Sequence, residues 1–498
     1  MSRPVAKIPT RIPGFDDLAL GGLPEGSTTL VSGPPGSGKT VFVTEFLTKG
    51  IEDRNENGVL VTLEESPERL RKYMAGFGWD IEEMERRNQW AFVDVSPHFD
   101  DPPFLEIGEF DLGALMARIQ HAIEKVNAKR LVIASLAAVL DKFNAQGIIR
   151  HELYRLTESL RRLGVLSLIT LERRHDDNVS VAYRVEDFVV DNVILLRNRL
   201  EVGSRRRTIE ILKFRGSPHS KGELPLSITS EYGLVVIPLT QLTLQRPASS
   251  QRVTSGVEEL DELCQGGFFQ GSVILVTGAT GCGKTLLSTE FVNGGVMKGE
   301  KALLCGFEES HDQLARNADS WGMALSEPEK NGLLKVHCTH PEAKILEEHL
   351  IDIKAMVDKF QPQRLVIDSL SALERIASRK GFREFVLAVS GAMKEREITT
   401  MFTLTTPSLM GGGSVTEGHI SSITDCIILL RYVELSGEVR RGLTVLKMRG
   451  SHHDHRIREF VINNRGMHIQ QPFTSVTGIL MGSPIYIEQP RTELEEGQ

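Results

Sequence analysis

Two glycine-rich stretches decide the fold of this chain: Gly33-Pro-Pro-Gly36-Ser37-Gly38-Lys39-Thr40 and Gly278-Ala-Thr280-Gly281-Cys282-Gly283-Lys284-Thr285. Both match G-x-x-x-x-G-K-[ST], and each follows an apolar run and precedes a helical one. The glycines let backbone N–H groups face phosphate oxygens, the lysine reaches the terminal phosphates, and the threonine hydroxyl coordinates Mg²⁺. We therefore predict two sites for ATP with Mg²⁺, which use Gly33, Gly36, Ser37, Gly38, Lys39 and Thr40 in the first loop and Gly278, Thr280, Gly281, Cys282, Gly283, Lys284 and Thr285 in the second.

The two phosphate loops belong to an internal repeat, and such a repeat determines architecture. Gly21-Gly22-Leu23 returns as Gly266-Gly267-Phe268, 245 residues later, and the phosphate loop returns at the same offset. Ile211-Leu-Lys213-Phe-Arg215-Gly216 returns as Val445-Leu-Lys447-Met-Arg449-Gly450 at an offset of 234. The difference predicts eleven additional loop residues in the first half, within residues 96–113. We expect a first domain over residues 1–242, a second over 243–485 and a short acidic tail over 486–498.

Within each half, short β-branched runs alternate with amphipathic stretches. In the first half the pattern predicts strands at 28–32 and 59–63 and helices at 41–50 and 67–76. Such alternation is typical of parallel strands connected by helices. The predicted fold class is therefore α/β, with a mostly parallel sheet flanked by helices in each domain.

Composition excludes several classes of protein. The chain has 498 residues, 40% of them hydrophobic and 25% charged, which is typical of globular proteins with more than one domain. No stretch resembles a membrane helix or a secretory leader, so we expect a cytoplasmic protein. The five cysteines form no C-x-x-C pair and indicate neither disulfides nor zinc. A net charge of −8 makes nucleic acid an unlikely partner.

A second acidic element is expected at the end of another strand, where it holds the metal or its waters. Arg364-Leu-Val-Ile-Asp368 fits this role, but the matching stretch in the first half is Arg130-Leu-Val-Ile-Ala134. Alanine cannot contact Mg²⁺, so we expect slower hydrolysis at the first site unless a neighbouring carboxylate compensates. The predicted metal-binding residues are Thr40, Thr285, Asp368 and Glu308.

Paired glutamates and paired cations also recur in both halves. Glu64 and Glu65, and likewise Glu308 and Glu309, end apolar runs, where a carboxylate can accept a proton from an attacking water or hydroxyl. The alternative is a pair of solvated loop acids. Each K-x-R pair, namely Lys213 with Arg215 and Lys447 with Arg449, can clamp phosphate charge, or it can form an exposed basic strand face.

These residues together resemble the KaiC family of clock proteins. The resemblance rests on two phosphate loops, the paired glutamates, the K-x-R-G strands and Ser421-Ser422-Ile-Thr-Asp425. It implies two tandem RecA-like P-loop NTPase domains that assemble into a double-ring homo-hexamer, with ATP between neighbouring subunits. By the same resemblance, Glu64 and Glu308 would be the bases of the two rings, Lys213, Arg215, Lys447 and Arg449 would reach the neighbour's nucleotide, and Arg375 and His219 would complete the ATP-binding set.

The resemblance also implies acceptor residues for phosphate and some departures from the family. The acceptors would be Ser421 and Ser422, and Thr416 matches a further residue that family members can phosphorylate. Only the second domain is expected to be modified, because the first-half counterparts are Asp187 and Phe188. The short tail makes a KaiA partner unexpected, whereas docking of a KaiB-like protein on the first ring remains open.

The sequence thus predicts a KaiC-like, Mg-ATP-dependent serine autokinase with autophosphatase and ATPase activities, acting as a timer or signalling switch. Two alternatives from other classes remain open. One is a RecA-like DNA-dependent ATPase, because fold does not settle function. The other is a scaffold that binds ATP only to assemble.

Overall fold

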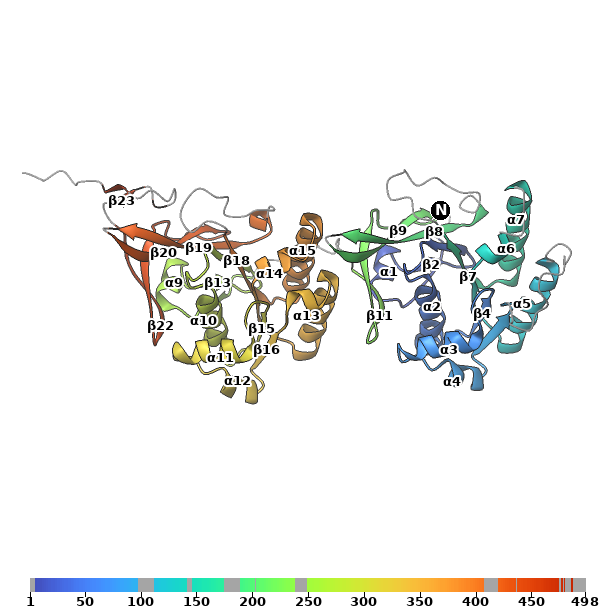
Figure 1. Ribbon diagram of the computed structural model, residues 1–498, viewed down its shortest axis with the longest axis horizontal. Coiled ribbons are helices and arrows are strands. Elements are labelled where there is room, and N and C mark those ends of the chain that lie inside the picture. The colour runs from blue at the N-terminus through green and yellow to red at the C-terminus, as the bar shows by residue number, and fades with distance from the viewer. Residues whose placement is uncertain are drawn as a thin grey trace, which may run out of the picture. The chain divides into compact units, whose positions relative to one another are not determined.

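The two phosphate loops lie in two separate α/β units. The computed structural model describes residues 5–96, 112–140, 146–173, 189–201, 203–237, 249–406, 420–435, 437–473, 476–477, 479 and 485–486. The chain divides into Met1–Thr240 and Gln241–Gln498 (Figure 1). Several predicted features lie outside the described residues, namely Thr416, Asp187, Phe188 and the tail from residue 487. Residues 238–248, which contain the predicted boundary between the domains, lie outside them as well. The domain and tail boundaries therefore stay predictions. Among the described residues, no helix is both long and apolar enough to cross a membrane.

The first unit alternates strands and helices as its sequence pattern predicts. The strands and helices expected at 28–32, 41–50, 59–63 and 67–76 are confirmed, each within a few residues of its predicted ends. In chain order the elements are β1 (Lys7–Ile8), α1 (Phe15–Leu18), β2 (Leu23–Pro24), β3 (Thr28–Gly33), α2 (Lys39–Arg54), β4 (Gly58–Thr62), α3 (Pro67–Ala75), α4 (Ile81–Arg86), β5 (Trp90–Asp94), α5 (Leu112–Val126), β6 (Arg130–Ala134), α6 (Ala137–Leu140), α7 (Gln146–Leu163), β7 (Leu166–Glu172), β8 (Asn192–Glu201), β9 (Ser204–Phe214), β10 (Leu224–Thr229) and β11 (Gly233–Val236).

The second unit repeats this order. Its elements are β12 (Arg252–Val253), α9 (Glu258–Leu263), β13 (Phe268–Phe269), β14 (Val273–Gly278), α10 (Lys284–Val296), β15 (Ala302–Gly306), α11 (His311–Ser320), α12 (Ser326–Lys330), β16 (Leu334–Cys338), η1 (Pro341–Ala343), α13 (Leu346–Phe360), β17 (Arg364–Asp368), α14 (Leu370–Glu374), α15 (Arg379–Glu395), β18 (Thr399–Thr405), η2 (Ile420–Ser422), β19 (Cys426–Leu435), β20 (Glu438–Met448), β21 (Arg458–Asn463), β22 (Gly466–Pro472), β23 (Val476–Thr477) and β24 (Ile485–Tyr486).

Each unit is built on a nine-stranded sheet, and the predicted α/β fold class is confirmed. The strand order is β11-β10-β9-β8-β3-β7-β6-β4-β5 in the first unit and β16-β15-β17-β18-β14-β19-β20-β21-β22 in the second. In both sheets six neighbouring strands are parallel, and the last three form an antiparallel extension. Every residue of β3 and β14 is buried, as expected for central strands covered on both faces.

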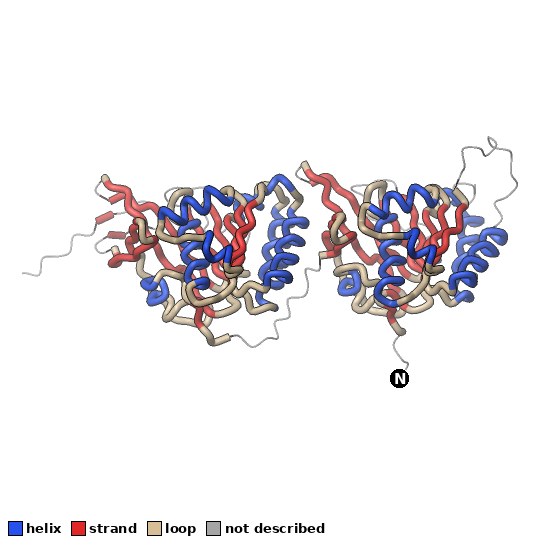
Figure 2. Tube along the Cα trace, turned by 90° about the horizontal axis from the view of Figure 1, so that it is seen from below, coloured by secondary structure: helices blue, strands red, loops and turns tan. Residues whose placement is uncertain are grey.

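Helices cover both faces of each sheet, and this arrangement creates the cores. In the first unit one buried cluster includes Phe42 and Phe46 of α2, and another includes Ile119 of α5 and Leu156 of α7. Figure 1 shows α2 and α5 on opposite sides of β4, and α10 and α13 on opposite sides of β15. Figure 2 shows the same layering of helices around strands within each unit.

The structure also locates the difference in length between the two halves. Equivalent residues are separated by 244 positions at the ends of β5 and β16 (Asp94 and Cys338), but by 234 at the starts of α5 and α13 (Leu112 and Leu346). Nearly all the additional residues of the first half therefore lie between β5 and α5. This agrees with the predicted segment, although residues 97–111 themselves lie outside the described part of the chain.

Candidate nucleotide-binding sites

Each phosphate loop joins the central strand of its sheet to a long helix. Lys39 Nζ donates hydrogen bonds to the carbonyl oxygens of Gly33 (2.8 Å) and Pro34 (2.9 Å). Lys284 Nζ does the same to Gly278 (3.0 Å) and Ala279 (2.9 Å). Each ammonium therefore lies across its own loop, close to where the pattern requires it for phosphate binding. The helices α2 and α10 begin directly after the loops, so their first N–H groups are free to bind anions.

Glycine is required at the last position before each helix. Gly38 has a φ of 99° and Gly283 a φ of 108°, a left-handed conformation that other residues rarely adopt. A Cβ at Gly38 would also approach Cδ1 of Ile228 in β10 to 2.6 Å. The left-handed φ, which both positions share, explains why this glycine recurs in both halves.

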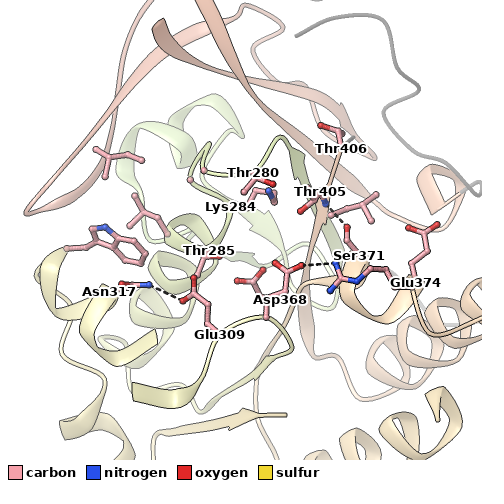
Figure 3. A pocket seen from close by; sticks show the side chains of 18 residues that line it. Thr280, Lys284, Thr285, Glu309, Asn317, Asp368, Ser371, Glu374, Thr405 and Thr406 are labelled. Atoms are coloured by element: carbon pink, nitrogen blue, oxygen red, sulfur yellow. Dashed lines mark hydrogen bonds and ion pairs between the residues drawn. The ribbon is translucent and has the colours of Figure 1, made fainter. Parts of the chain in front are cut away.

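The second unit contains a pocket of about 730 Å³ at its phosphate loop (Figure 3). The pocket brings together nine of the predicted site residues, namely Thr280, Gly281, Gly283, Lys284, Thr285, Glu308, Glu309, Asp368 and Arg375. Sequence reasoning missed other lining residues, including Asn317, Trp321, Ser371, Glu374, Thr405 and Ile462. Thr405 ends a β-branched run, a signal that could have been used, whereas Asn317 and Ile462 come from elements whose positions only the fold reveals.

Asp368 lies at the end of β17 and faces the phosphate loop. Its Oδ1 accepts a hydrogen bond from Thr403 Oγ1, and the Thr285 side chain is also hydrogen-bonded to it. Burial raises the pKa of Asp368, while these two hydrogen bonds act in the opposite direction. The pairing with Thr285 joins the two side chains that the sequence predicts as metal ligands.

The two glutamates of the second site have different surroundings. Glu308 Oε1 lies 3.8 Å from Arg375 Nη1, and the Glu308 side chain is 43% exposed. Glu309 Oε2 accepts a hydrogen bond from Asn317 Nδ2 at 3.0 Å (Figure 3). Burial raises the pKa of Glu309, and the negative charge of Asp368 adds to this effect. Glu308 is therefore the more accessible carboxylate of the pair.

The serine that follows each pair of glutamates explains part of the repeated motif. Ser66 caps α3 by accepting a hydrogen bond from the backbone N–H of Arg69, and Ser310 caps α11 in a reciprocal capping box with Gln313. The motif therefore sets the start of a helix and holds both glutamates in the loop at the carboxyl end of the preceding strand.

The first site keeps the loop and the glutamates but lacks the aspartate. Ala134 occupies the end of β6, in the register position that Asp368 has in β17. Burial raises the pKa of Glu64, whose carboxylate is hydrogen-bonded to Ser135. Glu65 Oε2 and Ser37 Oγ are buried and have no hydrogen-bond partner among the described residues. These unsatisfied polar atoms fit a site whose remaining partners come from a bound nucleotide and metal.

The four K-x-R cations make contacts within their own chain. Lys447 Nζ donates to the carbonyl oxygens of Ser421 (2.6 Å) and Thr424 (2.7 Å), and Arg449 Nη2 donates to that of Ser422 (2.8 Å). In the first unit Lys213 Nζ donates to Val190 O (2.7 Å), and Arg215 lies 3.8 Å from Asp191. The two lysines lie in β9 and β20, and the two arginines follow those strands.

His219 follows β9, the strand that contains Lys213, and lies far along the chain from the first phosphate loop. Its ring packs edge-on against Phe214 with 5.6 Å between ring centroids, and burial lowers the pKa of His219.

Ser421 and Ser422 lie in η2, with Ser421 half-buried and Ser422 exposed. Gly278 and Cys282 belong to the second loop but do not line the pocket, whereas the other predicted residues of that loop do.

A family model described as "ATPase: KaiC" matches residues 8–241 and again residues 253–473. A circadian clock protein KaiC3 from Synechocystis sp. is 52% identical over 493 residues, which cover 99% of this chain and 97% of the relative. The circadian clock oscillator protein KaiC of Thermostichus vulcanus is 49% identical (99% and 95% covered), and that of Synechococcus elongatus is 48% identical (97% and 92% covered). With two phosphate loops in tandem α/β domains, this chain belongs to the KaiC family of ATPases.

Proposed function

We propose that the second domain is a Mg-ATP-dependent serine autokinase that transfers phosphate to Ser421 and Ser422 of a neighbouring copy of the chain. The observation that carries this proposal is that the serines and the nucleotide pocket of one domain lie at opposite ends of the same sheet. Asp425, three residues after Ser422, exchanges hydrogen bonds with Val273 at the start of β14 (2.8 and 2.9 Å). The phosphate loop begins at Gly278, where β14 ends.

The length of β14 separates a serine from the pocket of its own domain. Five residue steps at about 3.3 Å each amount to roughly 17 Å. Phosphoryl transfer needs the acceptor oxygen within about 3–3.5 Å of the phosphorus, so this separation argues against transfer within one chain. Another copy must bring its serines to the pocket.

The K-x-R cations support the same arrangement. Lys447 and Arg449 lie at the serine end of the sheet, because Met448 pairs with Cys426 at the start of β19. Cations at this end can reach phosphate charge only on a neighbouring chain. A ring in which each domain offers its pocket to the next satisfies both requirements, and a double-ring homo-hexamer provides it for two tandem domains.

The chemistry of the second site follows from its side chains. Lys284 and the loop N–H groups bind the phosphates, and Thr285 and Asp368 hold Mg²⁺, which neutralises charge on the transferring phosphate. Glu308, the more accessible glutamate, accepts the proton of the attacking serine hydroxyl. The serine oxygen forms a bond to the γ-phosphorus as the bond to the oxygen shared with the β-phosphate breaks, and ADP leaves.

The first domain is proposed to bind Mg-ATP and to hydrolyse it with Glu64 as the base that activates water. Removal of phosphate from the serines would make the second domain an autophosphatase as well. Relatives with about half of their residues identical bear names of circadian clock proteins, which supports a role as a timer or signalling switch.

A mixing experiment tests transfer between copies. We would combine two full-length variants, one with Lys284→Ala, which cannot bind ATP in the second domain, and one with Ser421→Ala and Ser422→Ala, which has no acceptor. After incubation with Mg-ATP, peptide mass spectrometry should find phosphate on Ser421 or Ser422 of the Lys284→Ala chains. Each variant incubated alone is the control and should acquire none.

The result can contradict the proposal in two ways. If the parent protein acquires no phosphate on either serine, the kinase assignment is wrong and a scaffold that binds ATP is favoured. If the parent is labelled but the mixture is not, although the two variants assemble with each other, transfer occurs within one chain. Assembly of the mixture is checked with different affinity tags on the two variants.

A further inference from the structure

The end of β7 carries a carboxylate at the first phosphate loop that the second site lacks. In the first sheet Glu172 pairs with Gly33, the first residue of the loop. In the second sheet the equivalent partner of Gly278 is Thr405. The end of the next strand shows the reverse difference, with Ala134 in the first unit and Asp368 in the second. The first domain therefore carries its acidic side chain on the strand next to β3, one strand closer to the phosphate loop than Asp368 is in the second domain.

Backbone contacts fix Glu172 beside the loop lysine. The N–H of Arg173 donates a hydrogen bond to the carbonyl oxygen of Gly33 at 3.0 Å. The same carbonyl oxygen accepts the hydrogen bond from Lys39 Nζ at 2.8 Å. Glu172 therefore directly precedes the residue whose N–H shares the Gly33 carbonyl oxygen with Lys39.

The side chain of Glu172 influences both charged groups of the site. Burial lowers the pKa of Lys39, and the charge of Glu172 is the largest opposing influence, ahead of that of Glu64. Burial also raises the pKa of Glu64, and the charge of Glu172 adds to that effect. The Glu172 carboxylate is therefore close enough to act on the charge of both Lys39 and Glu64. The Glu172 residue is exposed, so its carboxylate can meet a ligand.

We propose that Glu172 supplies the carboxylate that holds Mg²⁺ at the first site, directly or through a bound water, in place of the aspartate that is missing at Ala134. Thr40 supplies the second protein oxygen. Mg²⁺ takes only one or two carboxylates and completes its shell with waters and substrate phosphates. Among the described residues, no three His, Cys, Asp or Glu side chains converge as a metal site.

Glutamate is suited to bind Mg²⁺ from the neighbouring strand in place of an aspartate at position 134. Its side chain is one methylene longer than that of aspartate, which adds reach and freedom. The inference rests on the proposed binding of Mg-ATP in the first domain but not on the kinase assignment of the second.

The test is a metal titration of the first site in full-length chains that carry Lys284→Ala, which removes nucleotide binding from the second domain. Mn²⁺ replaces Mg²⁺ so that bound metal is counted by electron paramagnetic resonance in the presence of ATP. Glu172→Gln should weaken Mn²⁺ binding by about 10- to 100-fold, the range seen when metal-site partners are removed. Adding Ala134→Asp to Glu172→Gln should restore most of the affinity, because it recreates the arrangement of the second site.

The controls distinguish metal binding from an effect of Glu172 on Lys39. Glu124→Gln, on the exposed face of α5, should leave Mn²⁺ affinity unchanged. Binding of ATP in excess EDTA should be the same in the parent and in Glu172→Gln, and an equal loss there would mean that Glu172 acts on Lys39, which overturns the proposal. Unchanged Mn²⁺ affinity in Glu172→Gln also overturns it. Phosphate on Ser421 and Ser422 is measured separately in chains with Lys284 intact, so failure of the kinase proposal is recognised independently.

Discussion

Glu290 Oε1 accepts a hydrogen bond from the backbone N–H of Met467 at 3.2 Å, and this contact joins the phosphate-loop helix α10 to the β21–β22 hairpin. Glu45 makes the equivalent bond in the first domain, to the N–H of Leu234 at 2.8 Å. Burial raises the pKa of both carboxyls to about 7. A Cβ at Gly466 would collide with Glu290 Oε1, which explains the glycine at this turn. In each domain, a glutamate with a pKa near neutrality therefore connects the helix that follows the phosphate loop to a β-hairpin of the antiparallel extension.

Glu290→Gln should reduce the pH dependence of stability. Because the folded pKa of about 7 exceeds the ordinary 4.5, the folded chain holds a proton that the unfolded chain releases between these values. The free energy of unfolding therefore falls as pH rises from 4.5 to 7, by about 3 kcal/mol from this group. Glutamine keeps the acceptor without the charge, so urea unfolding should show a flatter profile. Glu327→Gln, at an exposed residue of α12, is the control. Identical profiles for Glu290→Gln and the parent would contradict this account.

Arg364→Met should strongly destabilise the second domain. Arg364 is fully buried, with Nε 2.6 Å from Glu300, Nη1 donating to the carbonyl oxygens of Thr254 and Phe291 (both 2.7 Å), and its guanidinium over the Phe291 ring. Methionine leaves these oxygens without a donor, at a cost of about 3–5 kcal/mol. Arg396→Met removes an exposed pair with Asp358 and should cost less than about 1 kcal/mol. Equal losses in denaturant unfolding would show that burial of Arg364 is unimportant.

Some of this site could be predicted from the sequence because short motifs contain it. Lys39 and Lys284 follow their glycines directly, so spacing alone indicates phosphate binding. Glu172 could not be assigned, because its place beside the first loop comes from strand pairing with Gly33, more than 100 residues earlier in the chain. The same holds for Arg130 and Arg364, which begin apolar strands and give no sign that they are buried. For Lys447 the motif indicated phosphate, whereas the structure shows bonds to carbonyl oxygens that spacing does not reveal.

Lys447→Met should loosen the turn that carries Ser421 and Ser422. The substitution removes the hydrogen bonds to Ser421 O and Thr424 O but keeps most of the side-chain length. Amide hydrogen exchange across residues 421–424 should become faster even without nucleotide, and phosphate incorporation should fall by roughly 10- to 100-fold, because misplacement of an acceptor is costly. Lys213→Met, the equivalent change in the first domain, should speed exchange near Val190 and leave 421–424 as in the parent. Unchanged exchange in Lys447→Met would mean that the turn does not depend on this lysine.

Thr403→Val should shift the pH profile of the second site. The Thr403 hydroxyl donates to Asp368 Oδ1 and favours the ionised carboxylate against the effect of burial, so its loss raises the pKa of Asp368 further. Since Mg²⁺ binds the ionised form, the acid limb of serine phosphorylation should move to higher pH, and Mn²⁺ affinity on that limb should fall by roughly tenfold. Thr170→Val is the matched control, because Thr170 has the same place in β7 but the adjacent strand ends in Ala134. An unshifted profile in Thr403→Val would indicate that Asp368 is already ionised without this hydrogen bond, whereas a uniform loss at all pH values would indicate damage to packing.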